Sequence, residues 1–414
     1  MKDGVEEQAG RPSGWGSWWT QFPAPLRELA LLRLIAAIGT GGVLYLTPLV
    51  FEQVAFTPLQ VTGGLALASL AGAGGRLLCG HLLDRGLPCT VPLLLADAIA
   101  ISGDALLLQA FAFPPFAAGQ LLLGLAAGLY WPAIELAVPL TCSPLPSARA
   151  FALVRTADAA GVAFGALIGA GLAAAQRLRG IYVVDIAGLL LLAALLLSVP
   201  LPQLPPQPPG ARRSLQLGRW LPGLLPLLLI ALLATAVPAL MQSALPLDLV
   251  RGGLRRPAMA AAPGALLIGL QLGLLLLLQW PVGRALARRP VATGLAVSLV
   301  CLSAGAVLLA FSALLPWGLA LVLLALLPLA LGEAAFLPIA TESVVRLTPP
   351  EHRGLAMALF SQCFAISAVL APLLAGWLLQ RNGHGLWLWL LVAAALLLGL
   401  LPVRSLARQR GSGV

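Results

Sequence analysis

Apolar residues fill the chain in long continuous runs, each bounded by charged residues, prolines or glycines. The runs are about 20 residues or longer, and an α-helix of that length crosses a hydrocarbon core roughly 30 Å thick. The pattern predicts an all-α membrane protein with twelve transmembrane helices. The predicted helices occupy residues 28–51, 59–80, 89–112, 115–138, 149–174, 180–200, 221–248, 260–282, 291–314, 317–344, 354–380 and 385–403.

A proline-rich stretch that begins at Pro200 follows the sixth predicted helix, close to the midpoint of the chain. Prolines in close succession prevent helix and sheet, so this stretch is expected to be extended and solvated. It divides the chain into two six-helix halves. The predicted divisions are an N-terminal cytoplasmic or interfacial segment (1–27), a first half (28–200), a linker (201–220), a second half (221–403) and a cytoplasmic tail (404–414).

The two halves resemble each other at three places. Similar short segments begin at residues 80 and 283, at 130 and 336, and at 147 and 351. The three offsets are all close to half the chain length, which indicates a duplicated six-helix unit.

The composition agrees with a membrane location, because 60% of the residues are hydrophobic, only 10% are charged, and the mean hydropathy is +0.96. Such a chain has too little polar surface for a soluble protein of this size. The net charge of +10 does not indicate nucleic-acid binding, since the arginines are scattered between apolar runs and form no basic face.

The basic residues are distributed unequally between alternate loops. Of the 25 Lys and Arg residues, 17 fall in segments on the side of both termini, 6 fall on the opposite side, and 2 fall within spans. Cytoplasmic segments carry the excess of positive charge. We therefore expect both termini and the linker in the cytoplasm, and the protein in the cytoplasmic (inner) membrane.

Two motifs resemble signatures of the major facilitator superfamily. Gly80-x-x-x-Asp84-Arg85 follows the second predicted helix, and Gly161, Gly165 and Gly169 recur once per turn on the fifth. The glycine motif resembles that of the proton-coupled drug antiporters in this family. The resemblance implies a transporter of two halves that alternates between inward-open and outward-open states, with these six residues acting in the conformational change.

The sequence departs from the family pattern at three positions: Gly86 comes one residue early, Ala166 replaces a proline, and Gln120 stands where an arginine is expected. The motifs also have interpretations that need no family. Asp84 could meet a helix N-terminus or an arginine, or be a solvated acid that shapes a turn. The glycines allow another helix to approach closely, with or without a role in antiport.

Ionisable residues at membrane depth cost about 2.5–3.5 kcal/mol each and are candidates for function. Arg33 and Glu135 lie nearer the span ends, where they are expected to reach the interface. Arg155 and Asp158 are three residues apart and are expected to pair with each other. The residues well inside the predicted spans are Asp97, Asp104, Arg155, Asp158, Asp185 and Glu333.

Glu333 is the strongest candidate for a coupling or substrate-binding residue. It lies near the middle of its span, with no cation within four residues on that helix. The resemblance places this helix at the central cavity, where such a carboxyl group could exchange protons; alternatively, it is a packed, hydrogen-bonded acid. Asp97 and Asp104 are seven residues apart on one helix face, where Asp104 could carry a proton or both acids could be partnered by serine or backbone groups. Tyr130 and Trp131 either face the pathway or serve in packing.

These features predict a secondary transporter, most simply a proton-coupled exporter of a drug-like or amphiphilic compound. The alternatives are an importer of a sugar, organic acid or other nutrient, and a receptor or assembly factor on the same scaffold. The sequence has neither a nucleophile motif nor a Walker motif, and no C-x-x-C pair, so we expect no enzymatic activity, cofactor or metal. The expected partners are a small-molecule substrate, protons and membrane lipids, and the expected state is a monomer.

Overall fold

The computed structural model describes residues 19–84, 87–145, 147–198, 201, 217–286, 289–349 and 353–411. Twelve helical segments in this part of the chain are long and apolar enough to cross a membrane, with α13 and α14 together forming the last. The prediction of an all-α, twelve-span protein is therefore confirmed. The helices are α2 (Ala24–Glu52), α3 (Pro58–Asp84), α4 (Thr90–Gln109), α5 (Phe113–Thr141), α6 (Ser147–Ala174), α7 (Gly180–Ser198), α8 (Leu217–Arg251), α9 (Ala261–Leu286), α10 (Val291–Ser312), α11 (Gly318–Leu347), α12 (Arg353–Asn382), α13 (Leu386–Leu398) and α14 (Leu400–Gly411).

Several helices extend beyond the predicted apolar runs. α2 begins at Ala24, α8 begins at Leu217, and α14 continues to Gly411, so the predicted N-terminal segment, linker and tail each overlap a helix. Pro25 lies in the first turn of α2, where its missing N–H leaves no hydrogen bond unmade. Charged and polar residues also continue a helix beyond the hydrocarbon core. The length of an apolar run therefore underestimates the length of the helix. Most of the predicted linker lies outside the described residues.

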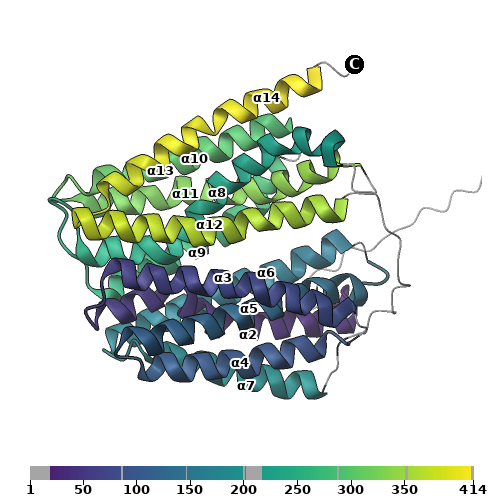
Figure 1. Cartoon of the computed structure of the whole chain (residues 1–414), viewed down its shortest axis with the longest axis horizontal. Helices are drawn as coiled ribbons and strands as arrows, with labels where there is room; N and C mark the ends of the chain where they lie inside the picture. Colours follow the sequence, from purple (N-terminus) through teal and green to yellow (C-terminus); the bar gives the residue numbers. More distant parts are fainter. Residues whose placement is uncertain are drawn as a thin grey trace, which may run out of the picture.

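The helices form two halves, α2 to α7 and α8 to α14, which lie one above the other in Figure 1. We call the side where α7 ends and α8 begins the linker side, and the opposite side the far side. α2 begins and α14 ends on the linker side, as an even number of spans requires. The far-side connections are residues 53–57, 110–112, 175–179, 252–260, 313–317 and 383–385.

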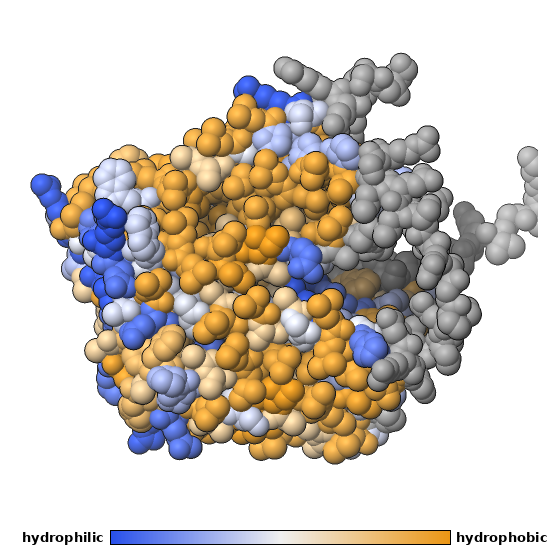
Figure 2. Space-filling model, in the orientation of Figure 1, coloured by the Kyte–Doolittle hydropathy of each residue, from blue (hydrophilic) through white to orange (hydrophobic). Residues whose placement is uncertain are grey.

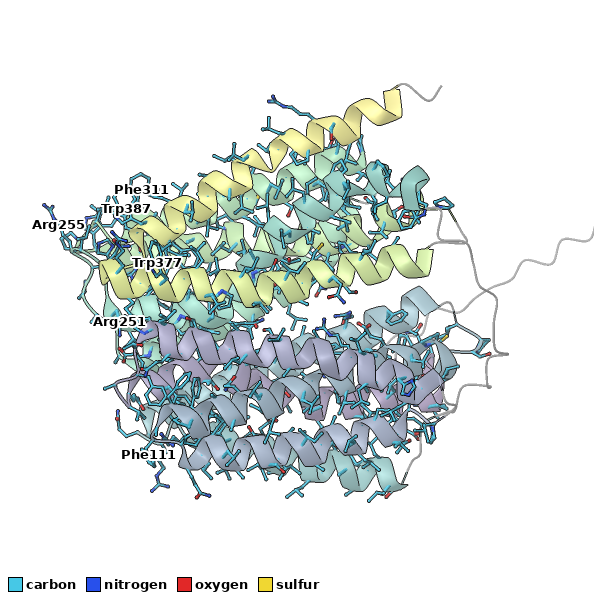
Figure 3. The ribbon with its side chains drawn as sticks, in the orientation of Figure 1. Phe111, Arg251, Arg255, Phe311, Trp377 and Trp387 are labelled. Carbon is cyan, nitrogen blue, oxygen red and sulfur yellow. The ribbon has the colours of Figure 1, made fainter. Side chains whose placement is uncertain are left out.

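The outer surface has the polarity expected of a membrane protein. Figure 2 shows a largely apolar surface, with polar residues gathered at the far-side edge. Exposed aromatic side chains lie near that edge (Figure 3), including Phe111, Trp377 and Trp387, which are 70%, 48% and 56% exposed. Aromatic residues favour the boundary between hydrocarbon and water, so they mark the far-side membrane interface.

Small residues hold the helices of the first half together at short distance. A Cβ atom on Gly161 of α6 would lie 2.6 Å from that of Ala37 on α2, and one on Gly165 would lie 3.0 Å from the amide nitrogen of Gly42. Lipid tails are as apolar as leucine, so helices in a membrane associate mainly through such close packing. The glycine stripe of α6 therefore packs against α2.

A fully buried ion pair fixes the far side of the second half. Asp248 at the end of α8 accepts hydrogen bonds from the Gly385 amide at 2.9 Å and from the Trp389 indole at 3.0 Å. Arg256 lies 3.2 Å from the Asp248 carboxylate and donates to the hydroxyl of Ser312 at 2.5 Å. Because both charges are paired and hydrogen-bonded, the network joins α8, α10 and α13 without leaving an isolated buried ion.

The two halves meet between the far side and the middle of the membrane. Gly376 of α12 packs directly on residues 58–62 of α3, and the Ser69 hydroxyl donates to the Ala368 carbonyl oxygen at 3.0 Å. Gly269 of α9 packs against α6 in the same layer. Small residues therefore allow close approach between the halves as well as within them.

At the far-side edge, Glu52 of α2 and Arg251 of α8 form an ion pair of 3.8 Å. It is the ion pair that joins the two halves within the described part of the chain. Toward the linker side the ribbons of α3 and α12 diverge (Figure 1), and Figure 2 shows a hollow between the halves with polar residues inside it. The structure is closed on the far side and open toward the linker side.

We predict that Gly165→Leu destabilises the protein by about 1–3 kcal/mol, because the added side chain has to displace the α2 backbone. Gly171→Leu on the same helix is the matched control, since a Cβ there meets open space. Apparent melting temperatures of the detergent-solubilised variants compare the two. Equal melting temperatures would contradict the packing role of Gly165.

Candidate functional site

The second half contributes an apolar and aromatic cavity wall with one acidic group. The cavity has a volume of about 110 Å³, and its lining includes Glu333, Gln279, Thr235, Phe336 and Phe364. Glu333 lies 15 residues from Gly318 and 14 from Leu347, hence at the middle of α11. The cavity therefore carries an ionisable group at the centre of the membrane.

Glu333 has no cationic partner among the described residues. The prediction that it faces the interior without a local cation agrees with this placement. Its helix is fixed at that point by the small residue Gly332, whose carbonyl oxygen accepts a hydrogen bond from Ser298 at 2.7 Å. The backbone that carries Glu333 is thus held rigidly against α10 while its carboxyl group faces the cavity.

Tyr45 connects this wall to the first half. Its hydroxyl is within hydrogen-bonding reach of Gln242 on α8 and close enough to Glu333 on α11 for an electrostatic interaction. Tyr45 is only 9% exposed. These three interacting side chains therefore come from both halves of the protein.

The first half contributes a charged wall. Arg33 of α2, only 5% exposed, forms an ion pair with Asp158 of α6. The Arg33 guanidinium also lies over the ring of Trp131 at 4.2 Å and that of Tyr130 at 5.1 Å. The expectation that Arg33 extends to the interface is wrong, because the ion pair and the two aromatic faces stabilise its charge in place.

Arg155 pairs with Glu135 of α5 at 3.0 Å, whereas Asp158 pairs with Arg33. The expected pair of Arg155 with Asp158 is therefore wrong, because partners on neighbouring helices replace the one on the same helix. Arg155 and Glu135 are 43% and 51% exposed. Charges at this depth are tolerated when they line a water-filled cavity, so this pair lies at the linker-side opening.

The remaining predicted residues lie away from these walls. Gln120 is buried on α5. It lines neither the cavity at Glu333 nor the pocket beside Arg33 and Arg155. Asp104 is buried on α4, in reach of Asp185 on α7 rather than of the cavity. Gly169 completes the glycine stripe by packing on Leu46 of α2.

The loop motif is only partly described. Gly80 lies on α3 with open space beside it, while Arg85 and the side chain of Asp84 lie outside the described residues. Their gating role stays a prediction.

Sequence reasoning missed two sets of contacts, one at the site and one at the far side. The first is the set of contacts that Tyr45 makes with Gln242 and Glu333, because these depend on helices from the other half. The pair Asp248 and Arg256 was also missed, since both residues fall near a predicted span end, where charges are ordinary. The signal for it was an acid at the end of an apolar run with an arginine eight residues later.

The fold and the site together define a polytopic membrane transporter built from two six-helix halves. The sequence profile of the Major Facilitator Superfamily matches residues 29–329 and 265–411. The chain therefore belongs to the major facilitator superfamily, and it is a secondary transporter of that type for small-molecule substrates. No curated protein matches the chain in sequence.

Several solved transporters share the fold. The nucleoside transporter NupG is similar with a TM-score of 0.74 and 14% identity, over 92% of this chain and 99% of that one. A POT family transporter in complex with 5-aminolevulinic acid gives a TM-score of 0.78 and 12% identity, over 94% and 96% of the two chains. A bacterial homologue of the human drug peptide transporters PepT1 and PepT2 gives 0.73 and 15%, over 93% and 98%. At these identities the likeness concerns the fold, and none of these neighbours singles out the drug and proton antiporter branch.

We predict that Asp158→Asn destabilises the protein by about 3–5 kcal/mol, since it leaves the buried Arg33 charge unpaired. Glu135→Gln is the control, because it breaks an exposed pair whose contribution is within about 1 kcal/mol. Thermal unfolding of the purified variants measures both effects. If Asp158→Asn is as stable as Glu135→Gln, Arg33 does not depend on this ion pair.

Proposed function

We propose that the protein exports an amphiphilic, drug-like compound in exchange for protons. The observation that carries this proposal is the carboxyl group of Glu333, which has no cationic partner among the described residues, in a wall lined mostly by apolar and aromatic residues. An apolar wall with a few polar groups suits a compound with a large hydrophobic part. The unpaired acid supplies a group that binds either a proton or a polar part of the substrate.

The exchange would follow from alternating access around Glu333. When the site opens to water on one side, hydration favours the ionised carboxylate and the release of a proton. When the site closes, the loss of water favours the neutral acid. A substrate that binds one protonation state better than the other shifts the balance between the two conformations. The loop residues Asp84 and Arg85, with Gly80, would bias that balance, and the α6 glycines would keep the first half rigid during the movement.

The linker side is proposed to be the cytoplasmic side, which makes the structure inward-open. The excess of arginine in the segments on this side supports that orientation. The protein would then reside in the cytoplasmic membrane with both termini inside. It would act as a transporter and not as an enzyme.

The second candidate function is import of a polar nutrient or metabolite. The exposed pair of Arg155 and Glu135 favours it, because those charges could bind a polar substrate directly at the opening. The structural neighbours that transport nucleosides and peptides are compatible with it. The direction of net transport in vesicles, measured with both kinds of compound, distinguishes the two functions.

We predict that Glu333→Gln abolishes transport driven by a pH gradient but preserves binding and exchange of substrate. Glutamine keeps the shape and hydrogen-bonding capacity of the side chain but does not ionise. Reconstituted vesicles with and without a pH gradient measure both activities.

Glu342→Gln is the matched control, because Glu342 lies on the same helix but is 47% exposed and paired with Arg346. That variant should transport like the parent. If Glu333→Gln still concentrates substrate against its gradient, Glu333 is a structural acid and the proposed coupling is wrong.

We also predict that a cysteine introduced into the 202–216 segment reacts with a membrane-impermeant thiol reagent only after the cells are opened. A cysteine at Leu254, exposed in a far-side loop, should react in intact cells. The reverse pattern would overturn the proposed orientation.

A further inference from the structure

Three aspartates are buried within the first half, away from the cavity. Asp97 and Asp104 on α4 are 1% and 0% exposed, and Asp185 on α7 is 4% exposed. None of the three forms an ion pair among the described residues. Both carboxyl oxygens of Asp97 and Asp104, and one of Asp185, also lack a hydrogen-bond donor. Carboxyl oxygens in this state need a source of positive charge or hydrogen.

The Asp104 and Asp185 side chains are within hydrogen-bonding reach of each other. Two carboxylates so close together in a low-dielectric interior cannot both be ionised. A proton held between them supplies the missing donor. The glycine at position 39 of α2 leaves the space that Asp185 occupies. A Cβ atom on Gly39 would lie 2.6 Å from the Asp185 Cα atom and 2.9 Å from its carboxyl carbon.

A hydroxyl group lies between these acids and the cavity wall. Tyr130 is 9% exposed, and its hydroxyl is within hydrogen-bonding reach of Arg33. It also interacts electrostatically with Asp97 and with Asp158. A tyrosine hydroxyl both accepts and donates hydrogen bonds, so it is able to accept a proton from one of these neighbours while donating its own to another.

We propose that Asp104 and Asp185 form a proton-binding site separate from Glu333, linked through Asp97 and Tyr130 to the Arg33 and Asp158 pair in the cavity wall. A proton fits the site better than a metal ion, because no group of three His, Cys, Asp or Glu side chains in the described part of the chain is placed to hold one.

The surroundings of the site contain few other charges. The ionisable groups that face it from the elements packed around it are Asp97 of α4, Tyr130 of α5, Arg33 of α2, Asp158 of α6, and Tyr182 of α7 with Arg179 just before that helix. Of the two cations, Arg33 is paired with Asp158, and Arg179 donates to backbone carbonyl oxygens at the end of α4. Neither cation neutralises the pair of aspartates.

Infrared spectroscopy of the purified full-length protein at neutral pH tests the site, because a protonated carboxyl group has its own carbonyl-stretch band. The parent carries Glu333→Gln, so that the cavity acid does not contribute. We expect a protonated-acid band that loses intensity in the Asp104→Asn/Asp185→Asn double variant. Each single variant should shift the frequency of the band, because the remaining acid gains an amide partner. The control variant Glu135→Gln should leave the band unchanged.

Three results would overturn the site: a parent without the band, an unchanged band in the double and single variants, or a band removed by sodium ions at constant pH, which indicates a cation instead. The isosteric single variants keep the test valid if the double variant does not fold.

The rate at which the band shifts after transfer to D₂O tests the link to the cavity. Tyr130→Phe keeps the ring beneath Arg33 but removes the hydroxyl, so we expect the exchange to slow several-fold. Tyr182→Phe, which removes a hydroxyl bonded to Thr47, should have a smaller effect. An exchange rate unaffected by Tyr130→Phe would overturn the link, and slowing by Tyr182→Phe alone would place the route on the far side.

Discussion

Close approach of helices across small residues is the interaction on which the architecture depends. Within the first half, Gly161 and Gly165 bring α6 against α2, and Gly75 and Gly128 do the same for α3 and α5. These contacts involve backbone atoms and leave little room for repacking, so we expect the first half to move as a rigid unit. Between the halves, the similar contacts among the described residues lie from the far side to the middle of the membrane, as at Gly376. A rocking motion would exchange this one set of contacts for another on the linker side.

The charges of the interior follow a second constraint, since each must be paired or neutral. The first half satisfies it with ion pairs such as Arg33 with Asp158, and the second half with Asp248 and Arg256 at its far-side edge. Glu333 is the acid that faces the cavity without a cation among the described residues. In the proposed mechanism, the charge of this residue changes with its exposure to water, and this change couples proton movement to transport.

Hydropathy alone predicted the fold, because spans of about 20 apolar residues have few alternatives in a membrane. Residue spacing and position within single spans also located Glu333 and the α6 glycines, because their signals lie within one helix. The sequence did not predict the partners of Arg33 and Asp104, because those partners lie on helices distant in sequence. Helix ends such as Ala24 were missed because polar residues continue a helix outside the hydrocarbon.

Distances between spin labels on the two sides test the alternating-access account most directly. One pair is placed at Gln53 and Leu254 on the far side and another at Ser143 and Arg289 on the linker side, in a background without the five native cysteines. The account predicts that a pH change or a transported compound lengthens the far-side distance and shortens the linker-side distance in the same fraction of molecules. Distances that stay fixed in protein that transports in vesicles, or that change in the same direction on both sides, would contradict it.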